Sequence, residues 1–167
     1  ARAMRRTVDR ELARARTAAR AVDAQADPAR VANGVIAVLR RTPEGARLHW
    51  QQTIPEGLAV ALDEADLAEA MGALAENAAR YARNKVVMSA RVQGDRVQLT
   101  IADDGAGIGK NDLDRLMRRY GRADEKGTGL GLAIATDIAE AAGGTLTLGD
   151  AAPGLAASLT LPLARLN

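Results

Sequence analysis

The sequence predicts an α/β two-layer sandwich, in which a mixed and mainly antiparallel sheet has helices on one face and is preceded by one further helix. Two observations carry this prediction. A tight turn at Gly94-Asp95 joins two strands whose apolar residues alternate, which is typical of an antiparallel hairpin. Segments with helical periodicity lie before and after that hairpin, and two more strands close the chain. Elements in this order pack as a layer of helices on a sheet.

The composition limits the classes of protein to consider. A chain of 167 residues suffices for one domain with an additional element. Cysteine is absent and His49 is the only histidine, which excludes a disulfide framework, a thiolate metal site and a multi-histidine site within one chain. No apolar run approaches the roughly 20 residues of a membrane-spanning helix. We therefore expect a soluble, cytoplasmic segment without direct membrane contact.

The first predicted helix runs from residue 2 to about residue 24, because this stretch lacks glycine and proline. Its apolar residues are spaced alternately four and three apart, as in a coiled-coil seam: Val8, Leu12, Ala15, Ala19 and Val22. The helix either packs on its own domain or belongs to a bundle whose partners lie in another segment or subunit. Binding of nucleic acid through its arginines is disfavoured, since Asp9, Glu11 and Asp23 interrupt the positive charge.

Two further helices have clear N-terminal signals. Asp27-Pro28 is an N-cap followed by a first-turn proline, and it predicts a helix over residues 29–41. Asp63 predicts the start of a helix over residues 64–83. The expected core residues of these two helices are Val31, Val35, Val38, Leu39, Leu67, Ala70, Met71, Leu74 and Ala78.

The remaining segments are strands and two more helices. Strands are predicted over residues 48–54, 58–62, 86–92, 97–101, 145–148 and 155–163. On the first strand Trp50 should face the core, and its neighbour His49 should face solvent. A short helix is predicted at 112–119, and a longer one from Leu130 to Ala141, with Gly143-Gly144 as its C-cap signal.

A glycine-rich stretch, Gly127-Thr128-Gly129-Leu130-Gly131-Leu132, leads into that longer helix. Glycines at a helix start let the backbone approach a ligand, and the free N–H groups there favour a phosphate. Such a stretch can also be no more than a tight turn. A dinucleotide fingerprint is excluded, because its sixth position is Leu132 and a polar loop precedes the motif. A P-loop is excluded by the lack of Gly-Lys-Ser/Thr.

Two other polar clusters accompany this stretch: Asn77 with Arg80 and Tyr81 on a helix, and Asp103-x-Gly105-x-Gly107 at a strand end. Each has a structural explanation when taken alone, but their combination and order fit a nucleotide site. A strand-end carboxylate can accept a hydrogen bond from an exocyclic amine such as that of adenine. An Asn carbonyl is a hard oxygen ligand suited to Mg²⁺. Arg80 and the glycine-rich helix start can meet phosphate oxygens.

These clusters resemble three motifs of the sensor histidine kinases. Glu76 to Tyr81 resembles their N box, Asp103 to Ile108 their G1 box, and Gly127 to Leu132 their G2 box. The segment from Arg119 to Asp124 is similar to the lid of the bacterial magnesium- and osmolarity-sensing kinases. The match covers about residues 46 to 163. It implies the Bergerat ATP-binding fold shared with gyrase, Hsp90 and MutL.

The resemblance also implies a division of the chain and a set of partners. Residues 1–25 would be part of the second helix of a dimerisation and phosphotransfer hairpin, and residues 26–167 would be the ATP-binding catalytic domain. The cofactors would be ATP and Mg²⁺. The partners would be a response regulator and, in the full-length protein, a second copy bound through the bundle helix, with no nucleic acid. The segment would be the cytoplasmic portion of a membrane-anchored sensor.

Site roles carry over onto matching positions only. Asn77 would hold Mg²⁺, and Asp103 would recognise adenine in a pocket shaped by Gly105, Gly107 and Ile108. Arg80 and Tyr81 would flank the nucleotide. Further candidates for phosphate contacts are Gly127, Thr128, Gly129, Leu130, Gly131 and Leu132. The lid residues Arg119, Arg122 and Lys126 are candidates for the γ-phosphate. Glu76 would either polarise a nucleophile or pair with Arg80.

Three departures from the family pattern qualify the resemblance. No phosphoacceptor histidine is present, because His49 lies on a predicted strand. Ala73 stands four residues before Asn77, where the N box often has another Asn, which bears on metal binding. The usual lid Phe is missing and the lid is short.

The leading functional prediction is a protein-histidine kinase domain that transfers the γ-phosphoryl group of ATP to a histidine outside this segment, for relay to a response regulator. Two alternatives stay open: another ATPase of the same fold that couples ATP to clamp closure, and a non-enzymatic regulator that binds nucleotide and dimerises.

Overall fold

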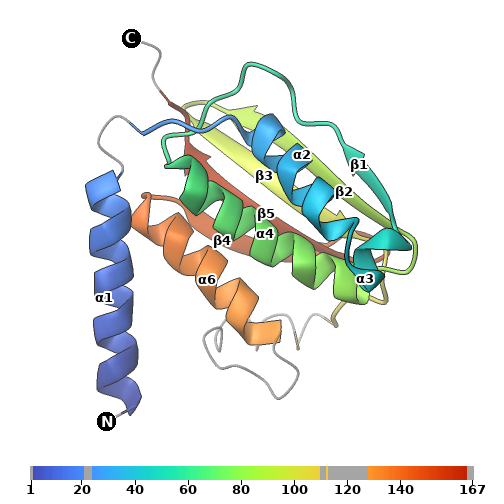
Figure 1. Cartoon of the computed structure of the whole chain (residues 1–167), viewed down its shortest axis with the longest axis horizontal. Coiled ribbons are helices and arrows are strands. Elements are labelled where there is room, and N and C mark those ends of the chain that lie inside the picture. Colours follow the sequence, from blue (N-terminus) through green and yellow to red (C-terminus); the bar gives the residue numbers. More distant parts are fainter. Residues whose placement is uncertain (1, 21–23, 110–111, 113–127, 165–167) are drawn as a thin grey trace.

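The computed structural model describes residues 2–20, 24–109, 112 and 128–164. Five strands form one sheet in the order β1-β2-β3-β5-β4, and helices α2, α4 and α6 cover one face of it (Figure 1). The helices are α1 (Arg2–Arg20), α2 (Pro28–Leu39), α3 (Pro43–Ala46), α4 (Glu64–Tyr81) and α6 (Thr128–Ala141). The strands are β1 (His49–Gln52), β2 (Lys85–Gln93), β3 (Arg96–Asp103), β4 (Thr145–Asp150) and β5 (Leu155–Pro162). The predicted fold class is confirmed.

The sheet is mixed and mainly antiparallel, as predicted. Only β1 and β2 pair in parallel, and the three other pairings are antiparallel. The predicted hairpin turn is present, with Gly94 in the left-handed region at φ 62°. The register places Val86, at the start of β2, opposite Asp103, at the end of β3. Because β2 follows α4 after a short connection, the end of α4 and the end of β3 lie at the same end of the central strands.

The predicted helix starts are confirmed by their caps. The Asp27 carboxylate accepts hydrogen bonds from the N–H groups of Ala29 (3.0 Å) and Arg30 (3.3 Å). The Asp63 carboxylate accepts one from Ala65 N–H at 2.9 Å. Each cap satisfies N–H groups that the first helical turn leaves without a backbone partner.

The core lies between the helices and the sheet and consists mainly of Leu, Val, Ile, Ala and Met. Trp50 is buried, as predicted, and its indole N–H donates to the Gly45 carbonyl at 2.9 Å. His49 is exposed, also as predicted. All five core residues predicted on α4 are buried.

Three local predictions were wrong. Val38 is 66% exposed, because Ala32 and Ile36 complete the buried face of α2 and leave Val38 at its edge. Val92, near the hairpin turn, is exposed and does not continue the buried face of β2. Residues 58–62 do not form a strand. Val60 alone makes isolated bridges there, to Ala26 and to Leu163.

Helix α1 packs beside α6 at the margin of the helical layer (Figure 1). Its polar face makes the contact, through ion pairs from Arg10 to Asp137 (3.6 Å) and from Arg14 to Glu140 (3.4 Å). The seam residues Val8 and Leu12 point elsewhere, since they are 54% and 50% exposed, while Val22 lies outside the described residues. Within the described residues, no helix is both long and apolar enough to cross a membrane.

Candidate functional site

The two glycine motifs, Asp103 to Ile108 and Gly127 to Leu132, both contact α4, on either side of Asn77. A Cβ on Gly131 of α6 would come within 3.3 Å of the Ala73 carbonyl oxygen on α4. A Cβ on Gly105, after β3, would collide with the Tyr81 carbonyl oxygen at the end of α4. Ala73, Asn77 and Tyr81 follow one another at intervals of one helical turn. The structure therefore brings the three motifs predicted from the sequence together around the C-terminal half of α4.

Asn77 presents an oxygen atom that no described residue uses. The side chain is 8% exposed, and its Oδ1 is buried without a hydrogen-bond partner in the described part of the chain. A buried carbonyl left without a partner is costly, which is why such groups normally find one. An unpaired hard oxygen beside a predicted phosphate site suits a divalent cation such as Mg²⁺.

Asp103 is 5% exposed at the end of β3. Its Oδ1 accepts hydrogen bonds from the N–H groups of Gly105 (2.9 Å) and Leu155 (3.4 Å). Burial raises the pKa of Asp103 above its ordinary value and the nearby charge of Asp104 adds to this, while the two backbone N–H groups partly oppose the shift. Both of these bonds use Oδ1, so Oδ2 is the atom that could accept a hydrogen bond from a ligand amine.

The turn between β4 and β5 closes one side of this carboxylate. Gly154 has φ 102°, and a Cβ there would collide with the Asp103 carbonyl oxygen. Gly107 has φ 74°, and its Cβ would lie 3.1 Å from the Gly154 carbonyl oxygen. Nothing in the sequence indicates that the connection between these strands packs on Asp103. The glycines at 107 and 154 are thus required by backbone conformation and close approach.

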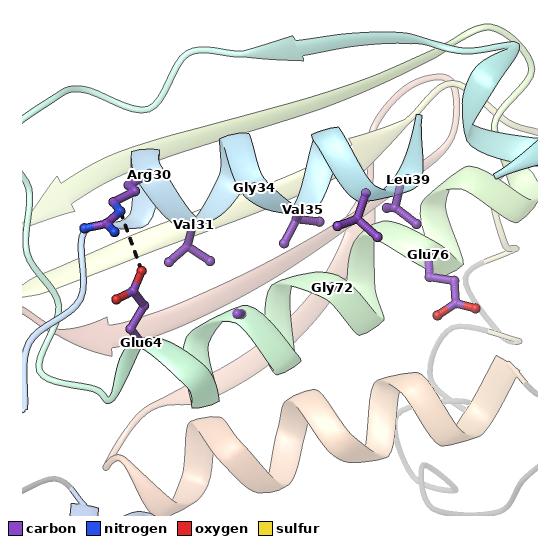
Figure 2. A pocket seen from close by; sticks show the side chains of 10 residues that line it. Arg30, Val31, Gly34, Val35, Leu39, Glu64, Gly72 and Glu76 are labelled. Carbon is purple, nitrogen blue, oxygen red and sulfur yellow. Dashed lines mark ion pairs between the residues drawn. The ribbon is translucent and has the colours of Figure 1, made fainter. Parts of the chain in front are cut away.

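The other candidates from the first two motifs lie at the surface around this centre. Arg80, Tyr81, Ile108 and Glu76 are exposed. Glu76 also stands at one end of a groove of about 500 Å³ between α2 and α4, while an ion pair between Arg30 and Glu64 (3.8 Å) stands at the other end (Figure 2). The groove is largely apolar between these ends.

The third motif is only partly described. Thr128, Gly129 and Leu130 lie in the first turn of α6, which begins two residues before the predicted start at Leu130. Leu132 is buried in the core. Any contact of Leu132 with a ligand would therefore use its backbone. Candidates Arg119, Arg122, Lys126 and Gly127 lie outside the described residues, as does the helix predicted at 112–119.

Two residues near the site were missed by the sequence reasoning. Asp104 accepts hydrogen bonds from three successive N–H groups just beyond α4, at Arg83, Asn84 and Lys85. Arg47 donates to carbonyl groups at the end of the same helix. Asp104 could have been suspected as a second acidic residue at the strand end. Arg47 gave no signal, because its partners lie more than 30 residues away in sequence.

Comparisons with known proteins agree with this geometry. Residues 62–165 match the family model described as histidine kinase-, DNA gyrase B-, and HSP90-like ATPase. The sensor protein kinase CarS of Pseudomonas aeruginosa is 40% identical over 126 residues, which are 74% of this chain and 28% of that protein. The sensor histidine kinase YkoH of Bacillus subtilis is 34% identical over 122 residues, 70% of this chain and 27% of that protein.

A solved structure shows the same fold. The mycobacterial sensor histidine kinase MprB superposes with a TM-score of 0.71 at 25% identity, over 85% of this chain and 98% of that one. The likeness to sensor histidine kinases expected from the sequence is thereby confirmed. The chain spans less than a third of the length of the two curated relatives. Because the family model covers well over half of its residues, this chain belongs to the histidine kinase-, DNA gyrase B- and HSP90-like ATPases.

Proposed function

We propose that the chain is the ATP-binding catalytic part of a two-component sensor histidine kinase. It would transfer the γ-phosphoryl group of ATP to a histidine outside this segment, and a response regulator would then receive the phosphoryl group. The observation that carries the proposal is the unpaired, buried Oδ1 of Asn77, flanked by two glycine motifs and accompanied by the buried carboxylate of Asp103. The similarity to sensor kinases supports it.

Asp103 is the group we assign to adenine recognition. Its Oδ1 is held by two backbone N–H groups, so Oδ2 keeps one orientation from which to accept a hydrogen bond from the exocyclic amine. Gly105 and Gly107 keep the space beside it free of side chains, and Ile108 offers an apolar surface next to the base. A preorganised acceptor of this kind selects an amine over a carbonyl at the same position of the base.

The phosphate side is assigned to α4 and to the start of α6. Asn77 would hold Mg²⁺ through Oδ1, with water and phosphate oxygens as the other ligands, and the ion would neutralise charge on the phosphates. Ala73 cannot add a second protein ligand, because its side chain is apolar. Arg80, Tyr81 and residues 126–132 would contact the nucleotide. Arg119 and Arg122 would face the γ-phosphoryl group, and Glu76 would help to polarise the attacking nitrogen.

In the transfer itself, the bond between the γ-phosphorus and the β–γ bridging oxygen breaks while a bond to an imidazole nitrogen forms, and ADP leaves. The acceptor would belong to another segment, since His49 is exposed on β1, outside the clusters that surround Asn77. We assign residues 1–25 to a dimerisation and phosphotransfer hairpin and residues 26–167 to the catalytic domain. The exposed seam of α1 suits pairing in such a bundle, in a homodimer whose sensor part would be anchored in a membrane.

The test combines binding with transfer in trans. Calorimetry should show ATP binding that Mg²⁺ strengthens. With γ-labelled ATP, label should appear on a separate polypeptide that carries a histidine-bearing bundle helix, and not on this chain alone. Hydrolysis of ATP without transfer would instead favour another ATPase of the fold, and binding with neither reaction would favour a non-enzymatic regulator.

A further inference from the structure

The chain reverses direction immediately after α4, close to the proposed nucleotide site. α4 ends at Tyr81, and Ala82 is already extended, with φ −61° and ψ 142°. β2 begins only three residues later, at Lys85. The end of a helix leaves carbonyl groups without backbone partners, and so sharp an exit leaves N–H groups unpaired as well. Side chains from two other segments satisfy both sets.

Arg47, which follows α3, satisfies the carbonyl side. Its Nη1 donates to the Arg83 carbonyl at 2.8 Å, and its Nη2 donates to those of Ala82 (2.8 Å) and Ala79 (3.3 Å). One guanidinium group thus binds three carbonyl oxygens spread over five residues. A planar guanidinium can form such a fork, whereas a lysine ammonium cannot reproduce its geometry.

Asp104, which follows β3, satisfies the N–H side. Its Oδ1 accepts from Arg83 (2.9 Å), Asn84 (3.0 Å) and Lys85 (3.1 Å), and its Oδ2 lies 3.2 Å from the Asn84 nitrogen. Burial acts to raise the pKa of Asp104, but these N–H groups outweigh it and leave that pKa below its ordinary value. Asp104 is therefore a charged acceptor throughout the neutral range.

The two side chains hold one short segment from opposite sides. Residues 82–85 lie between the guanidinium of Arg47 and the carboxylate of Asp104. Asp104 is the next residue after Asp103, and Gly105 lies against the Tyr81 carbonyl. The segment therefore joins the helix that carries Asn77 to the strand end that carries Asp103.

We propose that Arg47 and Asp104 are positioning residues, which set the separation between the phosphate side of the site at Asn77 and the adenine side at Asp103. This inference rests on the proposed function and adds two residues that act through the backbone, since both Nη atoms of Arg47 and the Asp104 carboxylate bind backbone groups. A ligand that spans both sides depends on that separation, whereas a ligand that occupies one side does not. ATP and adenosine are two such ligands.

The main experiment compares these ligands on variants of Asp104. We expect Asp104→Ala to weaken Mg²⁺-ATP binding by about tenfold and to change adenosine binding little, because only a ligand that spans both sides depends on their separation. Asp104→Asn keeps an oxygen that can accept all three N–H groups and should restore most of the ATP affinity. Asp95→Asn, in the exposed hairpin turn, is the matched control and should bind both ligands like wild type.

Arg47 is tested in the same way. Arg47→Met keeps the aliphatic stem and removes the donors, so it should lower ATP affinity more than adenosine affinity. Arg41→Met, at an exposed arginine nearby in sequence, is its control. Because both residues hold the same segment, Arg47→Met and Asp104→Ala should not be additive in a double-mutant cycle. Circular dichroism should confirm that each variant is folded at the temperature of the titration.

Two outcomes would overturn the inference. Folded Asp104→Ala protein that binds ATP like wild type would do so, as would an equal loss of ATP and adenosine affinity, which would indicate general destabilisation. Failure of the wild-type protein to bind ATP would refute the proposed function instead. The positioning role is then decided by NMR without nucleotide. The side-chain amide signals of Asn77 should shift in Asp104→Ala but not in Asp95→Asn, and an unchanged Asn77 would rule the role out.

Discussion

Gly131 on α6 faces the backbone of Ala73 on α4 so closely that a Cβ added to Gly131 would lie 3.3 Å from the Ala73 carbonyl oxygen. The sequence predicts a role in phosphate binding for this glycine. The structure gives it a second role, because a side chain at position 131 would press on the backbone of α4 where the two helices that flank the site approach one another.

A larger residue at position 131 should force these helices apart. We expect Gly131→Val to lower the free energy of unfolding by about 1–3 kcal/mol, the usual effect of overpacking. The matched control is Gly72→Ala, also within a helix, where a Cβ would meet no atom within 4 Å. That change should raise the free energy of unfolding by about 0.5–1 kcal/mol, because alanine favours a helix over glycine. Urea denaturation measures both, and equal effects of the two variants would contradict the contact.

Replacement of Asp103 by Asn should affect stability and binding in opposite directions. Burial raises the folded-state pKa of Asp103 above its ordinary value of 3.8, so ionisation penalises the folded state. That penalty is absent well below pH 3.8 and develops as the pH rises through the folded-state pKa. Asn keeps an oxygen for Gly105 and Leu155 without the charge. Asp103→Asn should therefore be more stable than wild type at neutral pH, with a difference that disappears in acid.

The same substitution should weaken ATP binding by about 1.5–3 kcal/mol, because the amide nitrogen of Asn takes the place of Oδ2 and the acceptor for the exocyclic amine is lost. Calorimetric titration at neutral pH measures this loss. Wild-type affinity in Asp103→Asn and in Asp103→Ala would contradict the assignment of this carboxylate to adenine.

Asn77→Ala should reduce the effect of Mg²⁺ on ATP binding without changing recognition of the adenine base. The variant removes the unpaired Oδ1, so the strengthening of ATP binding by Mg²⁺ should fall sharply while adenosine affinity stays near that of wild type. The folded protein should lose little stability, because a buried carbonyl without a partner contributes nothing favourable. Titrations with and without Mg²⁺ test this, and an unchanged effect of Mg²⁺ would exclude Asn77 as a ligand.

The contact between α1 and α6 should be weak but measurable. Burial raises the pKa of Asp137, and the charge of Arg10 opposes that shift, so Arg10→Ala should raise the pKa of Asp137 further. Since the two side chains are 51% and 25% exposed, a double-mutant cycle on Arg10 and Asp137 should give a coupling of only about 0.2–1 kcal/mol. NMR titration of the Asp137 carboxyl measures the first effect, and a pKa that stays constant would show that α1 leaves α6 in solution.

The fold was predictable where one local signal decided it. Asp27 and Asp63 cap helices because their carboxylates reach N–H groups two or three residues ahead, and Trp50 is buried because its strand alternates. The prediction that Val38 is buried was wrong, because the edge of the buried face of a helix depends on how far the neighbouring helix extends. The strand predicted over residues 58–62 is absent, because Val60 is the one residue there that forms bridges, to Ala26 and Leu163.

The candidate site divides in the same way. Asn77, Asp103 and the glycines belong to contiguous motifs, so the sequence could place them at one candidate site, and their roles there stay predictions. Arg47 and the turn at Gly154 act through the backbone of segments distant in sequence, and no pattern in one chain records such a contact. The roles of Gly127, Lys126, Arg119 and Arg122 stay predictions, since these residues lie outside the described residues.

The sheet has a bearing on how this chain associates with others. Its two edges are β1, which is only four residues long and has the sequence His-Trp-Gln-Gln, and β4, which ends in Gly149-Asp150. Short or polar edges are poor templates for strand addition. Extension of the sheet from one molecule to the next, which is one route to aggregation, is thereby disfavoured at both edges.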